Sequence, residues 1–171
     1  MAETEEPVKV HVEEFLVMGI AARTTNEREM SGKGAIGELW ATFLKNNFVE
    51  RIPGRLDNRI VAVYSDYANG KDGEYSYLLG ARVGSLEPAP EGMASHRIPS
   101  GDYAMFTAKG RPPAEMVVGI WKQIWSLETR DKLERAYRTD FEIYSDAANP
   151  ADTLVDVYVG LLFGKRAHGA G

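Results

Sequence analysis

The sequence predicts an α+β fold, built from two strand–helix–strand–strand repeats related by a pseudo-two-fold axis. Apolar residues alternate in several short segments, which is typical of half-buried strands. In two further segments they recur at helical spacing. The chain also repeats itself. Tyr64-Ser65-Asp66 returns 80 residues later as Tyr144-Ser145-Asp146, and Gly80 returns as Gly160. We therefore expect a mostly antiparallel sheet of about eight strands with two long helices.

The first repeat is predicted to begin with a long strand. Its alternating part is Val8–Val12, and it continues through Phe15–Ala22 after a bend at Glu13-Glu14. A loop is expected over 26–34. An amphipathic helix follows and ends before Pro53-Gly54, with the apolar face Ile36, Leu39, Trp40, Phe43, Leu44 and Phe48. Strands at 59–66 and 75–83 form a hairpin, whose turn contains Asn69-Gly70 and Asp72-Gly73.

The second repeat has the same order and follows a proline-containing connection, Leu86–Pro99. A strand is predicted at 101–109. The helix after Pro112-Pro113 carries the apolar stripe Val117, Ile120, Trp121, Ile124 and Trp125. Strands at 138–145 and 153–162 form the closing hairpin, joined through Asn149-Pro150. We expect one domain over 8–163, with repeats 8–84 and 98–163 and flexible tails at 1–7 and 164–171.

The composition is that of an ordinary globular protein, with 44% hydrophobic and 26% charged residues in a chain of 171. The formal net charge of −5 and the lack of a basic cluster argue against direct nucleic-acid binding. No cysteine is present, which excludes disulfides and thiolate chemistry. The acidic start is not a signal peptide, and no apolar run approaches the ~20 residues of a membrane span. These features predict a cytoplasmic protein without membrane contact.

Glu142 is the residue that points most directly to a function. It lies inside a predicted strand, and its counterpart at the shift of 80 residues is Ala62. An acid present in only one of two similar units indicates a task rather than a packing role.

Alternation along the strands predicts which residues share a face with Glu142. The odd positions Phe141, Ile143, Val155, Val157 and Val159 are expected to face the helices. The even positions Asp140, Glu142, Tyr144, Asp156, Tyr158 and Gly160 are expected to form an acidic and aromatic face, joined from the first repeat by Tyr64, Ala62 and Leu78. Aromatic rings and an acid near the seam of two repeats favour a ligand cleft.

Four groups of segments carry a family resemblance. They are Tyr77–Ala81, Pro90–Met93 with Ile98–Phe106, Ile120–Trp125, and Phe141–Tyr144 with Val155–Val159. Together they resemble the GyrI-like small-molecule-binding domain, also called the AraC-type effector-binding domain, and the resemblance covers about 8–163. It implies a cleft between the repeats that binds lipophilic, often cationic, small molecules.

The resemblance also implies roles for individual residues. Glu142 would supply the counter-charge, and the aromatic walls would come from Tyr158, Tyr64, Trp40, Tyr103, Phe106 and Trp121. Many relatives carry a helix-turn-helix DNA-binding unit. This chain has no room for one and is similar to a stand-alone form, so a separate regulator is a candidate partner. No metal and no cofactor are expected.

Other functions stay open on the same residues. In a hydrolase of reactive small molecules, Glu142 would act as general base on water, with Tyr64 or Tyr158 as hydrogen-bond donor. An inhibitor that binds gyrase is a further alternative, since relatives are named for that activity. Haem binding is a weaker alternative, with His11 and His96 as the internal ligand candidates; the histidines show no metal-ligand spacing.

Overall fold

The structure is a computed structural model that describes residues 7–70, 72–87, 89–109, 113–145 and 154–162. Apart from Pro7, the tails expected at 1–7 and 164–171 lie outside the described residues. The predicted turn at Asn149-Pro150 lies outside them as well.

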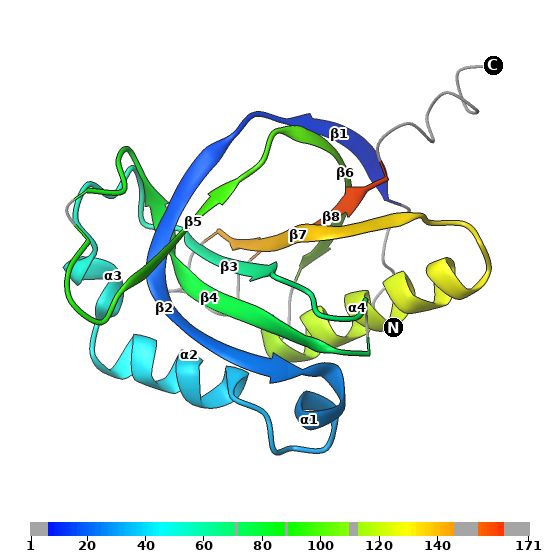
Figure 1. Ribbon diagram of the computed structural model, residues 1–171, viewed down its shortest axis with the longest axis horizontal. Coiled ribbons are helices and arrows are strands. Elements are labelled where there is room, and N and C mark those ends of the chain that lie inside the picture. Colours follow the sequence, from blue (N-terminus) through cyan, green and yellow to red (C-terminus); the bar gives the residue numbers. More distant parts are fainter. Residues whose placement is uncertain (1–6, 71, 88, 110–112, 146–153, 163–171) are drawn as a thin grey trace.

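Eight strands form one open antiparallel sheet in the order β1-β6-β8-β7-β3-β4-β2-β5 (Figure 1). The strands are β1 (Val8–Val12), β2 (Phe15–Thr25), β3 (Ile60–Ser65), β4 (Glu74–Val83), β5 (Ala94–Ile98), β6 (Gly101–Lys109), β7 (Arg135–Tyr144) and β8 (Leu154–Leu161). Each neighbouring pair is antiparallel. The predicted sheet is therefore confirmed.

Helices within the described residues are α1 (Asn26–Met30), α2 (Ile36–Lys45), α3 (Phe48–Arg51) and α4 (Pro113–Thr129). The two long helices, α2 and α4, complete the predicted α+β class. α1 lies where a loop was expected, and the Thr25 side chain caps it by accepting a hydrogen bond from Arg28 N. The first long helix ends earlier than expected because Asn47 adopts a left-handed backbone (φ 53°) between α2 and α3.

The centre of the sheet, β3 beside β7, carries the pseudo-two-fold relation. Ala62 pairs directly with Glu142, its own counterpart at the shift of 80 residues. The same shift exchanges the pair Tyr64–Asp140 with the pair Ile60–Tyr144. The axis therefore passes between Ala62 and Glu142.

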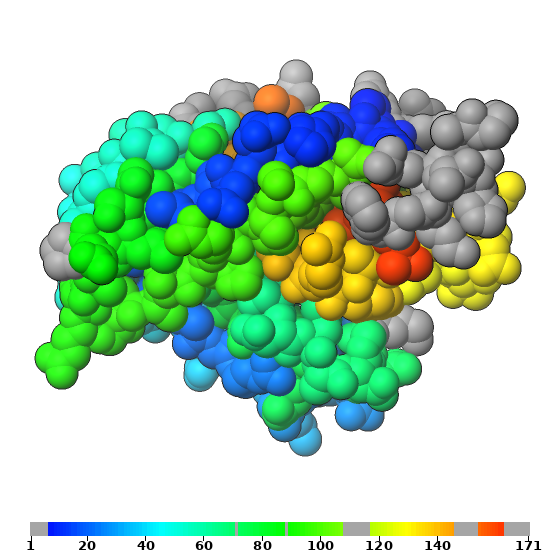
Figure 2. All heavy atoms as spheres, turned by 45° about the horizontal axis from the view of Figure 1, so that its top comes forward, coloured from blue at the N-terminus to red at the C-terminus, as the bar shows by residue number. Residues whose placement is uncertain are grey.

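The edge strands are exchanged between the two halves. β1 leads into β2 along the chain but pairs with β6, whereas β5 leads into β6 but pairs with β2. A shift of 86 residues maps the pair Val12–Gly101 onto the pair Ile98–Phe15. Figure 2 shows β1, in blue, against the green surface that includes β6. β5 corrects the prediction that 86–99 is only a connection. The single long strand predicted at the start of the chain is instead two strands, β1 and β2, divided at Glu13-Glu14 where a bend was expected.

The sheet has a buried core on each face. On the face covered by α2 and α4, Phe43, Ile120 and Trp121 pack with Tyr64 and Tyr77 of the strands (Figure 1). On the other face the buried residues are Val17, Val61, Val63, Leu78, Ile98, Tyr103 and Phe141. Both faces of the central strands are therefore removed from water.

The prediction that Phe141 and Ile143 of β7 face the helices is wrong. Glu142 pairs with Val157 and Phe141 pairs with Tyr158, and directly paired residues point to the same face. Glu142 and Tyr144 therefore share the helix-covered face with Val155, Val157 and Val159, while Phe141, Ile143, Asp156 and Tyr158 point the other way.

Leu78 was predicted to share a face with Tyr64, and this prediction is wrong for the same reason. Leu78 pairs with Val63 and lies on the opposite face of the sheet. Alternation holds along one strand, but the register of a hairpin decides how two strands combine.

Candidate functional site

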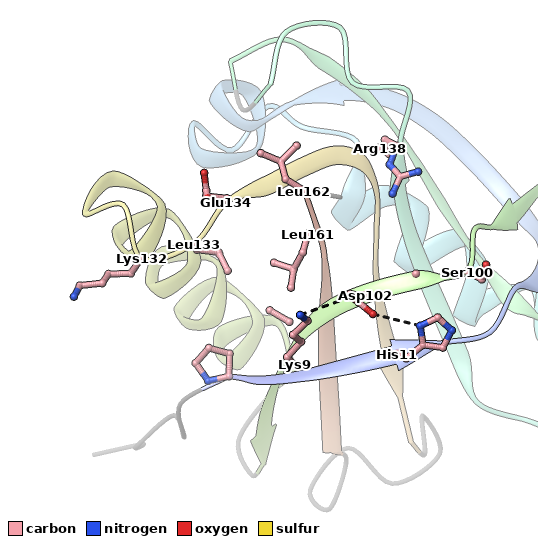
Figure 3. Close-up of a pocket in the computed structure, with 13 residues that line it drawn as sticks. Lys9, His11, Ser100, Asp102, Lys132, Leu133, Glu134, Arg138, Leu161 and Leu162 are labelled. Atoms are coloured by element: carbon pink, nitrogen blue, oxygen red, sulfur yellow. Dashed lines mark hydrogen bonds and ion pairs between the residues drawn. The ribbon is translucent and has the colours of Figure 1, made fainter. Parts of the chain in front are cut away.

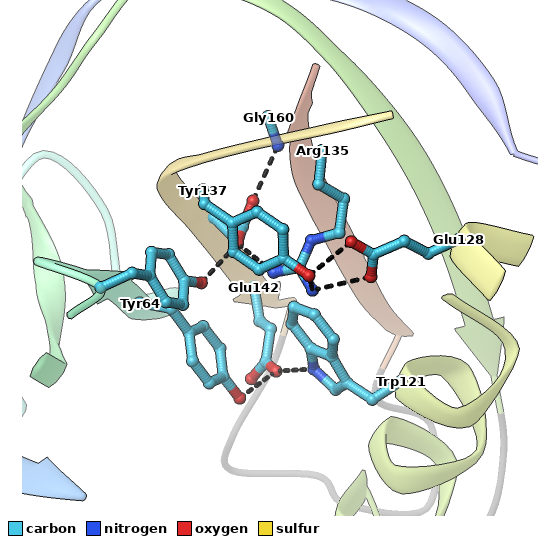
Figure 4. A network of polar contacts seen from close by, with 9 residues as sticks. Tyr64, Trp121, Glu128, Arg135, Tyr137, Glu142 and Gly160 are labelled. Atoms are coloured by element: carbon cyan, nitrogen blue, oxygen red, sulfur yellow. Dashed lines mark hydrogen bonds and ion pairs between the residues drawn. The ribbon is translucent and has the colours of Figure 1, made fainter. Parts of the chain in front are cut away.

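Glu142, in the middle of β7, is the centre of the candidate site. Its side chain is buried, with 0% exposed. Tyr64 Oη and Trp121 Nε1 donate hydrogen bonds to its Oε2 at 2.6 and 2.8 Å (Figure 4). Tyr144 Oη donates to its Oε1 at 2.8 Å. Within the described residues, no cationic side chain pairs with this carboxylate.

The electrostatics of the site follow from its burial. Burial raises the pKa of the Glu142 carboxyl above its ordinary value, and the three hydrogen bonds offset part of that rise. Burial and the neighbouring Glu142 raise the pKa of Tyr64 and of Tyr144 well above the usual range of tyrosine. Both hydroxyls therefore remain protonated donors. The site holds an acid that is hydrogen-bonded but lacks a counter-charge.

The two tyrosines that hold the carboxylate are repeat counterparts, since Tyr64 and Tyr144 are related by the shift of 80 residues. The helices contribute less symmetrically. Trp121 of α4 reaches Glu142, whereas Trp40 of α2 packs edge-on against Tyr144, with ring centroids 4.8 Å apart. The donors therefore come from both halves of the sheet, but only one helix contributes a direct contact.

Tyr75 and Tyr77 extend the aromatic wall, and sequence reasoning missed both. Their ring centroids lie 5.5 and 5.1 Å from that of Tyr64. Tyr77 Oη also accepts a hydrogen bond from Trp40 Nε1 at 2.8 Å. The available signal was the alternation of Tyr75 and Tyr77 within β4, but placing them beside Tyr64 required the register of the β3–β4 hairpin.

The predicted site residues divide between the two faces of the sheet. Tyr64 and Trp121 contact Glu142 directly, Trp40 reaches it through Tyr144, and Phe106 is buried in the same core. Tyr103 and Tyr158 lie on the opposite face, where the rings of both pack against Phe141, because Tyr158 pairs with Phe141 and Tyr103 pairs with Gly160. The structure therefore does not bring these two tyrosines to Glu142.

A surface pocket of about 540 Å³ lies where β1 and β6 meet the segment between α4 and β7 (Figure 3). In its wall, Lys9 Nζ and His11 Nδ1 lie 3.7 and 3.3 Å from the two carboxylate oxygens of Asp102. None of the residues predicted to bind a cationic ligand lines this pocket, although His11, the haem-ligand candidate, does. It is therefore a feature separate from the Glu142 centre.

The histidines considered for haem make ordinary polar contacts. His11 pairs with Asp102 and Glu13, and the His96 ring lies 3.2 Å from Thr139 Oγ1. Across the described ranges, no group of three or more His, Cys, Asp or Glu side chains is arranged to hold a metal ion. No helix in that part of the chain is long and apolar enough to cross a bilayer.

Comparisons with known proteins find relatives over most of the chain. The sequence model of the GyrI-like small molecule binding domain matches residues 5–162. YobU of Bacillus subtilis (strain 168), a protein proposed to be a transcriptional regulator, is 30% identical over 145 residues, which are 84% of this chain and 89% of YobU.

Two solved structures are similar. The integron cassette protein VCH_CASS2 of Vibrio cholerae has a TM-score of 0.77 and 26% identity, over 94% of this chain and 99% of that one. SAV2435 bound to tetraphenylphosphonium has a TM-score of 0.76 and 14% identity, over 97% of this chain and 99% of that one. At that identity, the second likeness shows the fold alone.

Proposed function

Because this chain belongs to the GyrI-like family of small-molecule-binding domains, we propose that its ligand is a lipophilic organic cation. The ligand binds at the junction of the two repeats, with Glu142 as counter-charge and aromatic rings as walls. The protein acts as a sensor or scavenger of such compounds.

The observation that carries this proposal is a buried acid without a charged partner. Three neutral donors hold the Glu142 carboxylate, and no cation among the described residues compensates it. Burying an ion without a counter-charge is costly, and a cationic ligand supplies the missing partner. At an effective dielectric constant of about 20, two unit charges 4 Å apart attract each other by about 4 kcal/mol before desolvation costs.

The rings around Glu142 favour a delocalised cation over a strongly hydrated one. Tyr64, Tyr144 and Trp121 contact the carboxylate, and a cation over the face of such a ring gains roughly 0.5–2 kcal/mol. Because Glu142 is 0% exposed, a ligand can reach it only if a donor moves. Its Oε2 accepts hydrogen bonds from two donors, so one donor can move away while the other still satisfies that oxygen.

The relatives support the ligand class. SAV2435, which shares the fold, binds tetraphenylphosphonium, a lipophilic monovalent cation. YobU is proposed to be a transcriptional regulator, which supports a role in sensing rather than in structure.

Glu142→Gln tests the proposal, with tetraphenylphosphonium as the probe. Glutamine keeps the size of the side chain, and its amide oxygen can accept from Tyr64 and Trp121, so the fold is expected to persist. We expect the dissociation constant, followed by tryptophan fluorescence, to rise about tenfold or more.

Asp156→Asn is the matched control for this test. It removes an acid from the neighbouring strand, but on the opposite face, since Asp156 pairs with Ile143. We expect this variant to bind the probe as the wild type does. Equal affinity of the Glu142→Gln variant and the wild type would count against the proposal.

One observation also favours a second function at the same centre. The raised pKa of Glu142 suits a general base, and Tyr64 Oη, 2.6 Å from Oε2, is a donor that can stabilise developing charge. Mass spectrometry of electrophilic compounds incubated with the protein distinguishes the two. If the wild type converts a compound and Glu142→Gln does not, the protein is an enzyme as well as a binder. If neither converts any compound, only the binding function is supported.

A further inference from the structure

Behind Trp121 lies a second polar cluster, built around Arg135 (Figure 4). The Arg135 side chain is 2% exposed. Its Nη2 donates to Asp140 Oδ2 at 2.7 Å, and its Nη1 lies 3.7 Å from Glu128 Oε1. The guanidinium carbon lies near three rings, 4.1 Å from the centroid of Tyr137, 5.3 Å from that of Trp121 and 5.9 Å from that of Tyr67. Two carboxylates thus fix a permanent cation against three aromatic rings.

A β-bulge in β7 creates this cluster. The register with β8 shifts between Arg135 and Asp140, and Tyr137 within the bulge has a φ of 55°, which is unfavourable for a residue with a side chain. Simple alternation would place Arg135 on the face of Phe141. The bulge turns it instead to the helix-covered face, beside Asp140. Backbone strain of this kind persists where its surroundings hold it, and it concentrates at functional sites.

The Arg135 cluster and the Glu142 centre meet at one side chain. Trp121 donates its indole N–H to Glu142 and presents its ring to Arg135. Neither feature is found in the first repeat. The counterpart of Glu142 is Ala62, and Arg55, the counterpart of Arg135, hydrogen-bonds to α3 and the loop after it. Two features specific to the second repeat therefore act on the same indole.

We propose that Arg135 is a positioning residue of the ligand site, because it holds the indole of Trp121 in the orientation in which Nε1–H reaches Glu142. Its effect on ligand affinity rests on the proposed function, but its effect on the indole does not. A planar guanidinium can lie over a ring while its N–H groups reach carboxylates at its edge, which the point charge of a lysine cannot do. When the support is lost, the indole turns and Oε2 of Glu142 loses one of its two donors.

Arg135→Lys tests this role, because it keeps a positive charge beside Asp140 and removes the planar group. The two readouts are the dissociation constant for tetraphenylphosphonium and the ¹H–¹⁵N signal of the Trp121 indole, assigned by its loss in Trp121→Phe. We expect the dissociation constant to rise about tenfold and the indole hydrogen to exchange faster with water. Arg55→Lys makes the same change at the counterpart position, and we expect neither readout to move.

The outcomes separate this inference from the proposed function. If Arg135→Lys leaves the indole signal and the dissociation constant unchanged, even with a lower melting temperature, the positioning role is overturned. If the wild type does not bind tetraphenylphosphonium, the proposed function fails and the indole signal alone decides the role of Arg135. If Arg135→Lys does not fold, Tyr137→Leu removes a ring beneath the guanidinium. It must give the same two changes, and unaltered readouts there overturn the inference.

Discussion

The pairing of Glu142 with Ala62 explains why only one repeat carries the acid. On the pseudo-two-fold axis a residue faces its own counterpart, and directly opposed residues of an antiparallel pair have Cα atoms about 4.5–5.5 Å apart. Two buried carboxyl groups at that distance could not both ionise at ordinary pH. A second acid opposite Glu142 is therefore disfavoured at the axis position, and the pairing with Ala62 avoids it.

The raised pKa of Glu142 predicts a specific pH dependence of stability. The unfolded state loses this proton near the ordinary glutamate pKa, about 4.3, and the folded state loses it only at a higher pH. The wild type therefore loses stability as the pH rises through that window. Glu142→Gln has no such proton, so the unfolding free energy of the variant minus that of the wild type should grow across the window and then level off.

Urea denaturation of both proteins from pH 4 to 8 measures this difference. A difference that falls with pH would mean that the folded state favours the charged carboxylate. Affinity for a permanent cation should change in the opposite sense to wild-type stability. It should strengthen as the pH rises, because only the ionised carboxylate attracts the ligand.

The sequence allowed Glu142 and part of its surroundings to be identified. The acid stood out because its counterpart in the other repeat is alanine, and Tyr64 was placed correctly because β3 and β7 pair on the axis. Arg135 could not be found, because the bulge that turns it toward Trp121 breaks the alternation on which face assignment depends.

At the scale of elements, the register of the two hairpins determines which strand residues share a face, and the sequence did not predict this register. The strands and the two long helices follow from local periodicity. In both hairpins, however, even positions of one strand pair with odd positions of the next, as with Glu142 and Val157 or Tyr64 and Tyr77. This register places Tyr77 in the site and Tyr158 outside it. Only the geometry of the turns fixes it.

The close approach of the paired strands β2 and β4 at two glycines gives a prediction at the scale of elements. Gly19 pairs with Gly80, and a Cβ added at Gly80 would lie 1.9 Å from the backbone oxygen of Met18. At its repeat counterpart Gly160, the nearest atom, Thr139 O, would be 2.9 Å away. We expect Gly80→Ala to destabilise the protein by about 3 kcal/mol or more and Gly160→Ala by about 1 kcal/mol.

Thermal and urea unfolding of the two glycine variants compare these costs directly. Equal destabilisation of the two variants would contradict a closer approach of neighbouring backbone at Gly80 than at Gly160.

The whole molecule is held together by strands exchanged between its halves. β1 pairs with β6, β5 pairs with β2, and the helix-side core joins Trp121 of one repeat to Tyr64 and Tyr77 of the other. A ligand site at the junction therefore needs both repeats.

This exchange predicts that a single repeat does not fold alone. A fragment of residues 8–84 loses the partner of β1 and one of the two partners of each of β2 and β3, and it leaves half of the helix-side core exposed. We expect no cooperative urea transition for this fragment when circular dichroism is followed. A sigmoidal transition would show instead that the first repeat is an independent unit.

The central claim is that a buried carboxylate selects the charge of the ligand. Calorimetric titration with tetraphenylphosphonium and tetraphenylborate, ions of similar shape and opposite charge, tests it most directly. We predict that the wild type binds the cation about a hundredfold more tightly than the anion, and that Glu142→Gln narrows this difference. Equal affinity of the wild type for both ions would contradict the claim.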